Sequence, residues 1–252
     1  MRSGYFSGSR PRVLAHRGFA QDAPENTLLA FLYALALGVT HLETDVRATR
    51  DGVAVLAHDP DLQRLAGRPE RIDSLTFAQL SVIALGAEQR VCTLSQALNA
   101  FPEARFNLDI KSPDAVQPSV DAIRGARATH RVLVTSFSES RRRATVRQLP
   151  GVATSASAPL VALAYTFAQL RLVTLLDRVL RHVDAVQIPE RYCGLRVVTP
   201  RTLDSFKRNG KEVHVYTVNE PADMRRLWRN RVDGVVTDRA DLALGEAANF
   251  TQ

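Results

Sequence analysis

The fold is decided by residues 12–38, which read RVLAHRGFAQDAPENTLLAFLYALALG. The apolar run RVLAH predicts a buried strand over residues 12–16, and ENTLLAFLYALALG predicts a helix over residues 25–38. A strand followed by a helix is the repeating unit of a parallel α/β sheet. Packing alone does not explain why the strand ends in His16 and Arg17.

The same alternation continues along the chain. Further strands are predicted at 41–46, 105–110, 131–137, 151–156, 184–189, 212–218 and 233–238, with helices between most of them, such as 138–149, 199–210 and 220–230. Eight such units in about 250 residues predict a single-domain α/β protein with the (β/α)₈ TIM barrel fold. An open doubly wound sheet is the alternative, but the first turn lacks the G-x-G-x-x-G loop that is typical of it.

One interval breaks this rhythm, because roughly 45 residues separate the second and third strands. Within it, GVAVLAHD at 52–59 predicts a short extended segment, and SLTFAQLSVIALG at 74–86 predicts a small helix. We interpret residues 59–92 as an insertion after the second strand, too short to bury a core of its own. The barrel is expected to span residues 12–247 and to follow a flexible tail at residues 1–11.

Composition favours a cytoplasmic protein. Cys92 and Cys193 are far apart and show no metal-ligand spacing, so neither a disulfide framework nor a zinc site is expected. The first dozen residues lack the apolar run of a secretion signal, and the most apolar stretch, residues 158–170, is shorter than the ~20 residues of a membrane-spanning helix. Packing of that stretch on the barrel is favoured over contact with a membrane. The sequence does not indicate an oligomeric state.

The chain is basic, with 33 lysine and arginine residues against 26 acidic residues and a net charge of +7. A positive surface favours phosphate-bearing partners. The arginine clusters at 141–143 and 225–231 lie in helix-like segments without interleaved aromatic residues, so we interpret them as solvated helix faces and expect no nucleic-acid partner.

Acidic residues lie where the second and third strands end. Glu43 and Asp45 point to the same side of a strand because they are two residues apart, and Asp109 and Lys111 form a second such pair. Buried carboxylates repel one another unless a cation lies near them. One Mg²⁺ or Ca²⁺ ion bound by Glu43, Asp45 and Asp109 is therefore favoured over the alternative, structural salt bridges with nearby arginines.

Two histidines also end apolar extended runs, at the position where a barrel carries catalytic groups. His16 and His58 are candidates for a general acid and a general base, since imidazole titrates near neutral pH. Arg17 and Lys111 are candidate cations for phosphate oxygens and for developing negative charge, although they also balance the acids. The remaining histidines are expected to be structural or superficial: His41, His130, His182 and His214.

Five blocks of the sequence resemble, in order, the signature blocks of the glycerophosphodiester phosphodiesterase family. They are HRGFAQDAPENT (16–27), ETDVRATRDGVAVLAHD (43–59), LDIK (108–111), YTVNE (216–220) and DGVVTD (233–238). The resemblance runs from about residue 12 to about residue 245. It implies a TIM barrel with an insertion after the second strand and a divalent-metal-dependent hydrolase. Such a hydrolase cleaves glycerophosphodiesters to sn-glycerol 3-phosphate and an alcohol.

The resemblance implies the same roles that the residues suggest by themselves. The family's acid and base histidines fall on His16 and His58, its phosphate-binding arginine on Arg17, its metal carboxylates on Glu43, Asp45 and Asp109, and its charge-stabilising lysine on Lys111. Two positions depart from the family pattern: Asp109 replaces a glutamate, and Tyr216 replaces a tryptophan. Tyr216 is expected to line the substrate pocket, so this departure bears on the substrate more than on the reaction.

Three alternatives stay open at this point. The nucleophile is either water or the substrate's own 2-hydroxyl, which would form a cyclic phosphate. The substrate is either a glycerophosphodiester or a lysophospholipid, cleaved in the manner of a lysophospholipase D. A barrel that only binds a phosphorylated ligand is the alternative from another class, and it is disfavoured because the chain retains every acid and histidine of the set.

Overall fold

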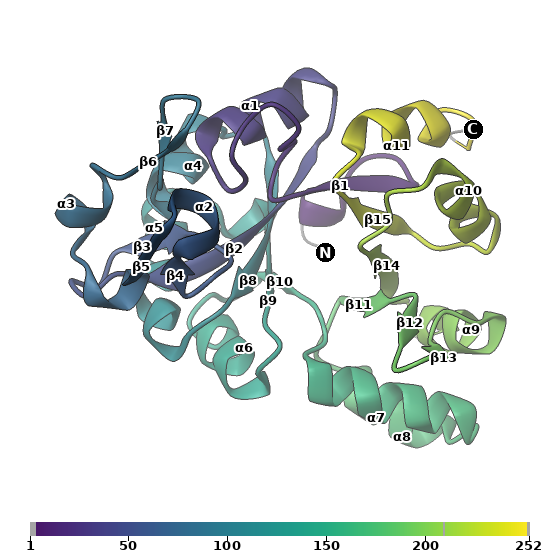
Figure 1. The fold of residues 1–252 in the computed structure, drawn as a ribbon. Coiled ribbons are helices and arrows are strands. Elements are labelled where there is room, and N and C mark those ends of the chain that lie inside the picture. The colour runs from purple at the N-terminus through teal and green to yellow at the C-terminus, as the bar shows by residue number, and fades with distance from the viewer. Residues whose placement is uncertain (1–3, 209, 251–252) are drawn as a thin grey trace.

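Eight parallel strands form a barrel at the centre of the computed structural model, which describes residues 4–208 and 210–250 (Figure 1). The strands are β1 (Arg12–His16), β2 (His41–Ala48), β8 (Arg105–Ile110), β9 (Val132–Thr135), β10 (Ala153–Thr154), β11 (Ala185–Pro189), β14 (Glu212–Tyr216) and β15 (Gly234–Thr237). Each coincides with or overlaps one of the strands expected from the sequence.

The barrel closes between its fifth and sixth strands. The strand order is β10-β9-β8-β2-β1-β15-β14-β11, and a parallel bridge between Ser155 and Ala185 joins the two ends. Two backbone hydrogen bonds support this bridge, from the Asp184 amide to the Thr154 carbonyl (2.8 Å) and from the Ala156 amide to the Ala185 carbonyl (3.0 Å). The predicted (β/α)₈ barrel is confirmed.

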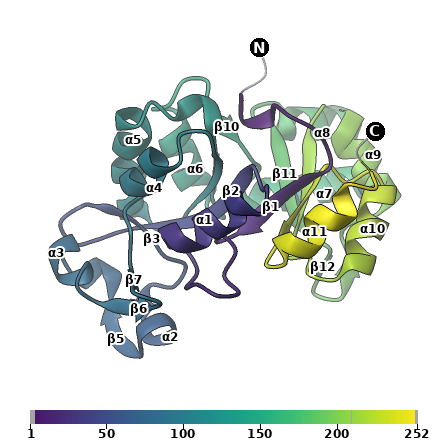
Figure 2. The ribbon, with the colours of Figure 1, turned by 90° about the horizontal axis from the view of Figure 1, so that it is seen from above.

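Helices surround the barrel and bury their apolar faces on it (Figure 2). They are α1 (Leu28–Ala36), α4 (Leu94–Ala100), α5 (Val116–Gly125), α6 (Glu139–Val146), α7 (Ala158–Gln169), α8 (Val173–Leu180), α9 (Pro200–Arg208), α10 (Pro221–Arg229) and α11 (Ala240–Ala247). Helix α1 begins after Thr27, whose side chain accepts a hydrogen bond from the Ala30 amide (3.3 Å). The apolar stretch at 158–170 forms α7 and buries Ala164 and Ala168. No helix in the described part of the chain is long and apolar enough to cross a membrane.

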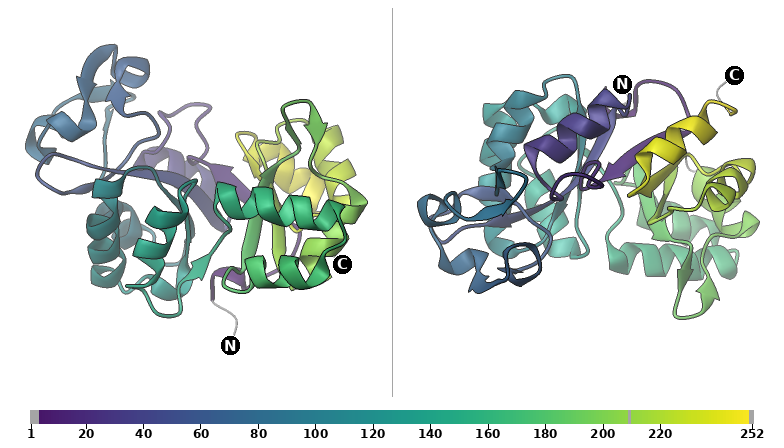
Figure 3. Two further views of the ribbon diagram at one scale, coloured as in Figure 1. Left: turned by 90° about the horizontal axis from the view of Figure 1, so that it is seen from below. Right: turned by 45° about the horizontal axis from the view of Figure 1, so that its top comes forward.

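The insertion leaves the barrel after β2, and Figure 3 shows it on the opposite side of the barrel from the N-terminus. Its elements, with the strand that leads into it, are β3 (Ala54–Leu56), β4 (Asp61–Leu62), α2 (Gln63–Ala66), β5 (Arg68–Arg71), η2 (Ile72–Ser74), α3 (Phe77–Leu80), β6 (Ala84–Gly86) and β7 (Gln89–Arg90). The extended segment at 52–59 is confirmed as β3, antiparallel to β2. The helix expected at 74–86 is limited to α3, because residues 84–86 pair with β7 instead.

The insertion takes part in a small apolar cluster. Leu62, Ile72, Leu80, Ile83, Leu85 and Val91 pack on Val55 and Ala57 of the β3 segment. The insertion thus does not form this cluster alone, because Val55 comes from β3, which pairs with β2 of the barrel, and Ala57 directly follows β3.

The expectation of a flexible tail at residues 1–11 is wrong for Tyr5 and Phe6, which are buried. A 3₁₀ turn, η1 (Gly4–Phe6), places Tyr5 and Phe6 in the interior, with Tyr5 fully buried. Tyr5 packs against His41, with ring centroids 5.1 Å apart, and against apolar residues of β9, β10 and β11. Two aromatic side chains thus cover the amino-terminal end of the barrel, although the polar residues around them suggested a loose segment. Residues 1–3 lie outside the described residues.

Candidate active site

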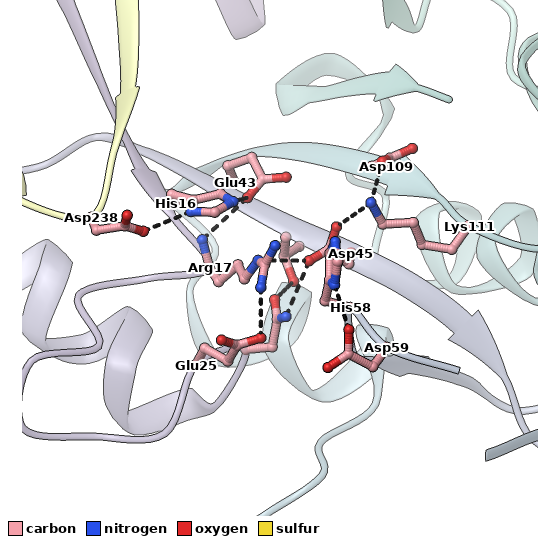
Figure 4. Close-up of polar contacts among 12 residues, drawn as sticks. His16, Arg17, Glu25, Glu43, Asp45, His58, Asp59, Asp109, Lys111 and Asp238 are labelled. Atoms are coloured by element: carbon pink, nitrogen blue, oxygen red, sulfur yellow. Dashed lines mark hydrogen bonds and ion pairs between the residues drawn. The ribbon is translucent and has the colours of Figure 1, made fainter. Parts of the chain in front are cut away.

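The predicted site residues meet at the carboxyl-terminal end of the barrel strands (Figure 4). His16 at the end of β1 is in register with Glu43 of β2, and Asp45 of β2 is in register with Asp109 of β8. Alternate residues of a strand point to the same side, so these side chains all face the barrel interior. The strand-end argument therefore predicted the right neighbours.

Lys111 lies between two of the carboxylates. Its Nζ is 2.9 Å from Asp45 Oδ1 and 2.7 Å from Asp109 Oδ2. Burial disfavours the charged form of Asp45, but Lys111 and Arg17 outweigh burial and hold the pKa of this carboxyl below its usual range. Burial raises the pKa of Asp109 despite the opposing effect of Lys111. The predicted charge balance by basic residues is thus present at Asp45.

Glu43 is a buried carboxyl group next to Asp45 and His16. Burial and the neighbouring Asp45 raise the pKa of Glu43 to about 8. Its Oε2 accepts a hydrogen bond from the Arg17 amide (3.1 Å) and lies 4.0 Å from His16 Nε2. Asp109 Oδ1 is buried without a hydrogen-bond partner. The site therefore has more carboxylate oxygen than its own cations satisfy.

These features fit a hard divalent cation by their chemistry. Three carboxylates match the oxygen ligands that Mg²⁺ and Ca²⁺ prefer; Glu43 and Asp109 have raised pKa values, and Asp109 also has an unsatisfied buried oxygen. Among residues 4–208 and 210–250, however, no three aspartate, glutamate, histidine or cysteine side chains already form a metal-binding group. The donor set is present, while Lys111 occupies the space between two of its members.

His16 is held by a partner that the sequence argument did not assign. Its Nδ1 is 2.6 Å from Asp238 Oδ1. Asn219 fixes Asp238 in turn, since its Nδ2 donates to Asp238 Oδ2 (2.8 Å) and its Oδ1 accepts from the Asp238 amide (2.9 Å). Burial alone would lower the pKa of His16, but Asp238 and Glu43 outweigh it and the net pKa is raised. The arrangement turns Nε2 toward Glu43 and the interior of the site.

His58 has a carboxylate partner as well. Its Nδ1 is 2.8 Å from Asp59 Oδ1, and its backbone carbonyl accepts two hydrogen bonds from the Arg47 guanidinium (2.9 and 2.6 Å). Hydrogen bonding at one ring nitrogen orients the other nitrogen for proton transfer. Both candidate acid–base residues therefore share one arrangement, a ring directed by an adjacent carboxylate.

The HRG stretch bends sharply after β1. Arg17 and Gly18 both have positive φ angles, of 58° and 86°. A Cβ atom at position 18 would lie 2.7 Å from the backbone of Ala30, so only glycine fits against α1 there. The bend returns the Arg17 guanidinium to the site, where Nε lies 3.2 Å from Asp45 Oδ2 and Nη1 lies 2.9 Å from Glu25 Oε1.

Apolar side chains border the same end of the barrel. Tyr216, at the end of β14, is partly buried, and burial together with the charge of Asp109 raises its pKa. The ring of Phe137 lies 5.7 Å from Lys111 Nζ and is 58% exposed. The hairpin β12–β13 (Arg191–Tyr192 and Leu195–Arg196) carries Tyr192 and Leu195, which are both exposed. Tyr216 thus stands at the end of its strand, close enough to Asp109 for that charge to affect its pKa, and its role as a pocket wall stays a prediction.

Two of the remaining histidines, His41 and His214, lie outside this site. His41 and His214 are buried toward the amino-terminal end of the barrel, where His41 Nε2 contacts the Tyr5 carbonyl (3.0 Å) and His214 Nε2 contacts Glu212 (3.2 Å). Burial lowers the pKa of His41 to about 3, so it is neutral at physiological pH. Their expected structural role agrees with these contacts.

The sequence argument missed Asp238, Asn219, Glu25 and Asp59 as partners of the site. Asp238 directly follows β15 and Asn219 lies three residues beyond the end of β14, so the rule that selected His16 and Asp109 also applied to them. Glu25 lies in the block at 16–27, just before helix α1, and Asp59 lies in the block at 43–59, next to His58. Their contacts with other residues are apparent only in the folded chain.

Arg17 and Lys111 can bind an anion, and they lie near two histidines that are each oriented by a carboxylate. This arrangement suits the cleavage of phosphoric diesters, because that reaction needs a bound phosphate and proton transfer at two oxygens. Comparison with known sequences gives the same class. Residues 16–242 match the model of the glycerophosphoryl diester phosphodiesterase family. The chain belongs to this family and is a phosphoric diester hydrolase.

Individual relatives agree with this assignment. The chain is 42% identical over 232 residues to a protein named probable glycerophosphodiester phosphodiesterase 2 of Mycobacterium tuberculosis, covering 91% of this chain and 88% of the relative. The fold is similar to that of a solved phosphodiesterase from Silicibacter pomeroyi (TM-score 0.81, 23% identity, 98% of this chain and 96% of that one). It is also similar to a phosphodiesterase of Oleispira antarctica solved with the product sn-glycerol-3-phosphate (TM-score 0.75, 22% identity, 94% and 96% covered).

Proposed function

We propose that this enzyme hydrolyses glycerophosphodiesters, such as glycerophosphocholine and glycerophosphoethanolamine, to sn-glycerol 3-phosphate and the free alcohol. The observation that carries the proposal is the pairing of each histidine with its own carboxylate, His16 with Asp238 and His58 with Asp59, beside Arg17 and Lys111. The name of the Mycobacterium tuberculosis relative and the product bound to the Oleispira antarctica enzyme support this substrate class.

In the proposed mechanism, Arg17 and Lys111 hold the phosphate oxygens and offset the negative charge that builds up during P–O cleavage. A nucleophile oxygen bonds to phosphorus while the bond from phosphorus to the alcohol oxygen breaks. One histidine takes the proton of the nucleophile, and the other gives a proton to the leaving oxygen. The nucleophile is water, or the substrate's 2-hydroxyl, in which case water opens the cyclic phosphate in a second step.

We also propose that Glu43, Asp45 and Asp109 hold one Mg²⁺ or Ca²⁺ ion. When bound, such an ion supplies positive charge that polarises a phosphoryl oxygen. The raised pKa of Glu43 and the unsatisfied oxygen of Asp109 support a further cation in addition to Lys111. The cytoplasmic location expected from the sequence stays a prediction.

A second candidate substrate is a lysophospholipid, from which the enzyme would release the head-group alcohol. The observation that favours it is the exposed apolar rim formed by Phe137, Tyr192 and Leu195, which are 58%, 68% and 63% exposed. Large exposed apolar side chains beside a polar site suit an acyl chain. Comparing the hydrolysis of glycerophosphocholine with that of lysophosphatidylcholine separates the two substrates.

The direct test is release of sn-glycerol 3-phosphate from glycerophosphocholine in the presence of Mg²⁺ or Ca²⁺. His16→Ala and His58→Ala are each expected to lower turnover by about 10²- to 10⁴-fold, the usual contribution of acid–base catalysis. His182→Ala, which changes an exposed histidine, serves as the control and should leave turnover unchanged. Near-wild-type turnover of both site variants refutes the histidine assignment, and the absence of any phosphodiester cleavage favours a barrel that only binds its ligand.

A further inference from the structure

Arg64 is the residue of the insertion that contacts two carboxylates of the site region at once. It lies in the short helix α2, and its guanidinium donates to Glu25 through Nη2 (2.7 Å to Oε1) and Nη1 (2.8 Å to Oε2). Its Nε donates to Asp59 Oδ2 at 2.6 Å. All three guanidinium nitrogens are therefore engaged, with a two-point contact to one carboxylate and a single contact to the other.

Each of these carboxylates also holds a residue of the proposed machinery. Glu25 Oε1 accepts from Arg17 Nη1 at 2.9 Å, and Asp59 Oδ1 lies 2.8 Å from His58 Nδ1. Figure 4 shows Glu25 and Asp59 beside Arg17 and His58 at the site. A continuous row of ionic contacts thus runs from Arg17 through Glu25, Arg64 and Asp59 to His58.

We propose that Arg64 is a positioning residue, which fixes the phosphate-binding Arg17 and the acid–base His58 relative to each other through Glu25 and Asp59. The inference rests on the proposed function, because it gives a purpose to the roles of Arg17 and His58 stated there. It also assigns the insertion a part in the site, since the residue that joins the two halves comes from α2.

The need for such a contact follows from where the two residues lie. His58 stands beyond the end of β3, outside the parallel barrel, and its side chain is 37% exposed. Arg17 lies in the bend after β1. Both positions lack the rigid backbone pairing of a central strand, and a shift of about 1 Å in a reacting group can cost about 10²-fold in rate.

The same geometry distinguishes positioning from stabilisation. The Arg64 side chain is 48% exposed, and exposed ion pairs contribute only about 0–1 kcal/mol to folding. Removing the guanidinium should therefore affect catalysis far more than unfolding. Arg68 offers a matched control, because its side chain is also 48% exposed and its ion pair, with Glu70, lies within the insertion.

The experiment compares Arg64→Gln and Arg64→Lys with Arg68→Gln in the full-length enzyme supplied with Mg²⁺ or Ca²⁺. We expect Arg64→Gln to lower kcat/KM for glycerophosphocholine by about 10- to 100-fold and to weaken the binding of sn-glycerol 3-phosphate measured by calorimetry. Arg64→Lys should lie between it and the wild type, since an ammonium group cannot make the same fork of contacts. Arg68→Gln should leave turnover and binding within about twofold of the wild-type values. The thermal midpoints of Arg68→Gln and Arg64→Gln should agree within a few degrees.

A double-mutant cycle with Glu25→Gln tests the path of the effect. If Arg64 acts through Glu25, the loss in the binding of sn-glycerol 3-phosphate for the double variant is smaller than the product of the two single losses. The proposal is overturned if Arg64→Gln equals Arg68→Gln in both turnover and binding, or if the two single losses simply multiply. The proposed function fails on a different result, the absence of sn-glycerol 3-phosphate release by the wild type, while the binding measurements still report on Arg64.

Discussion

At Asp238 we expect the conservative substitution to asparagine to lower activity more than the substitution to alanine. The Asp238 carboxyl is held in the ionised form, because the hydrogen bonds to His16 and Asn219 outweigh burial and lower its pKa. It therefore accepts the proton of His16 Nδ1 at 2.6 Å. Its other oxygen accepts from Asn219 Nδ2 at 2.8 Å. Asp238→Ala removes the hydrogen-bond partner of His16. Asp238→Asn removes the negative charge and replaces the two accepting oxygens with one accepting oxygen and one donating NH₂ group.

The magnitude follows from these contacts. A hydrogen bond to a charged group contributes about 1.5–3 kcal/mol, and the lower end applies here because the Asp238 side chain is 45% exposed and water replaces part of the contact. Asp238→Ala should thus lower kcat/KM by about tenfold. In Asp238→Asn, the amide oxygen must face Asn219 to keep accepting its hydrogen bond. The new NH₂ group then faces His16 Nδ1, so two N–H donors point at each other. This conflict costs about 1 kcal/mol more, so the total loss approaches about 70-fold.

The assay measures kcat and KM for glycerophosphocholine with each variant, and Asp241→Asn, an exchange on the neighbouring helix α11, is the control. Adding Asn219→Asp to Asp238→Asn should recover part of the loss, because the new carboxylate accepts the NH₂ group and returns the amide oxygen to His16. The reasoning is refuted if Asp238→Asn is within about threefold of the wild type, if it is more active than Asp238→Ala, or if the double variant recovers nothing.

Three further predictions concern stability, metal binding and the pocket wall. Glu212→Gln should lower the free energy of unfolding by about 3 kcal/mol in urea denaturation, because it removes the carboxylate that contacts the buried Arg12 at 2.8 and 3.1 Å. His214 and Arg12 outweigh burial and lower the pKa of Glu212, so this stabilisation is present above the unfolded pKa of about 4.3 and is lost as the pH falls below it; a flat acid profile contradicts the prediction. Adding Mg²⁺ or Ca²⁺ at about 100 times Kd to chelator-treated protein should stabilise it by about 2.7 kcal/mol, since the cation offsets the charge that raises the pKa of Glu43; an unchanged thermal midpoint argues against a metal site. Tyr216→Phe should change kcat for glycerophosphocholine by less than about threefold if the ring acts as a wall, and a loss of about 100-fold would instead assign its hydroxyl a part in proton transfer.

The fold was predictable because its signal is local. Each barrel strand shows in a short apolar or β-branched run, and each helix in the spacing of its apolar residues, so the order of elements can be read without knowing any contact. The errors arose where tertiary contacts override composition. Residues 4–11 are polar overall, yet Tyr5 and Phe6 fill the open end of the barrel. The apolar cluster of the insertion includes Val55 of β3 and the following Ala57, so its packing depends on a strand that is paired with the barrel.

The candidate site was predictable in its members but not in its connections. His16, Glu43, Asp45 and Asp109 stand at strand ends, and parallel strands bring those ends together, so the sequence indicated which side chains meet. The partner of each was not encoded locally. Lys111 bridges two acids that were expected to share a metal, and Arg64 reaches Glu25 across 39 positions of the chain.

The sequence by itself determined the barrel, the end of the barrel that carries the candidate site, and the family, since periodicity and strand-end polarity are properties of neighbouring residues. Only the tertiary structure decided how those groups are held. Asp238 reaches His16 across 222 positions because β15 pairs with β1 when the barrel closes, and the docked insertion places Arg64 between Glu25 and Asp59. Closure of the barrel brings polar residues from separate strand ends within hydrogen-bond distance of one another. Hydrogen bonds depend on distance and angle, and the spacing of residues in the sequence does not specify these across the barrel.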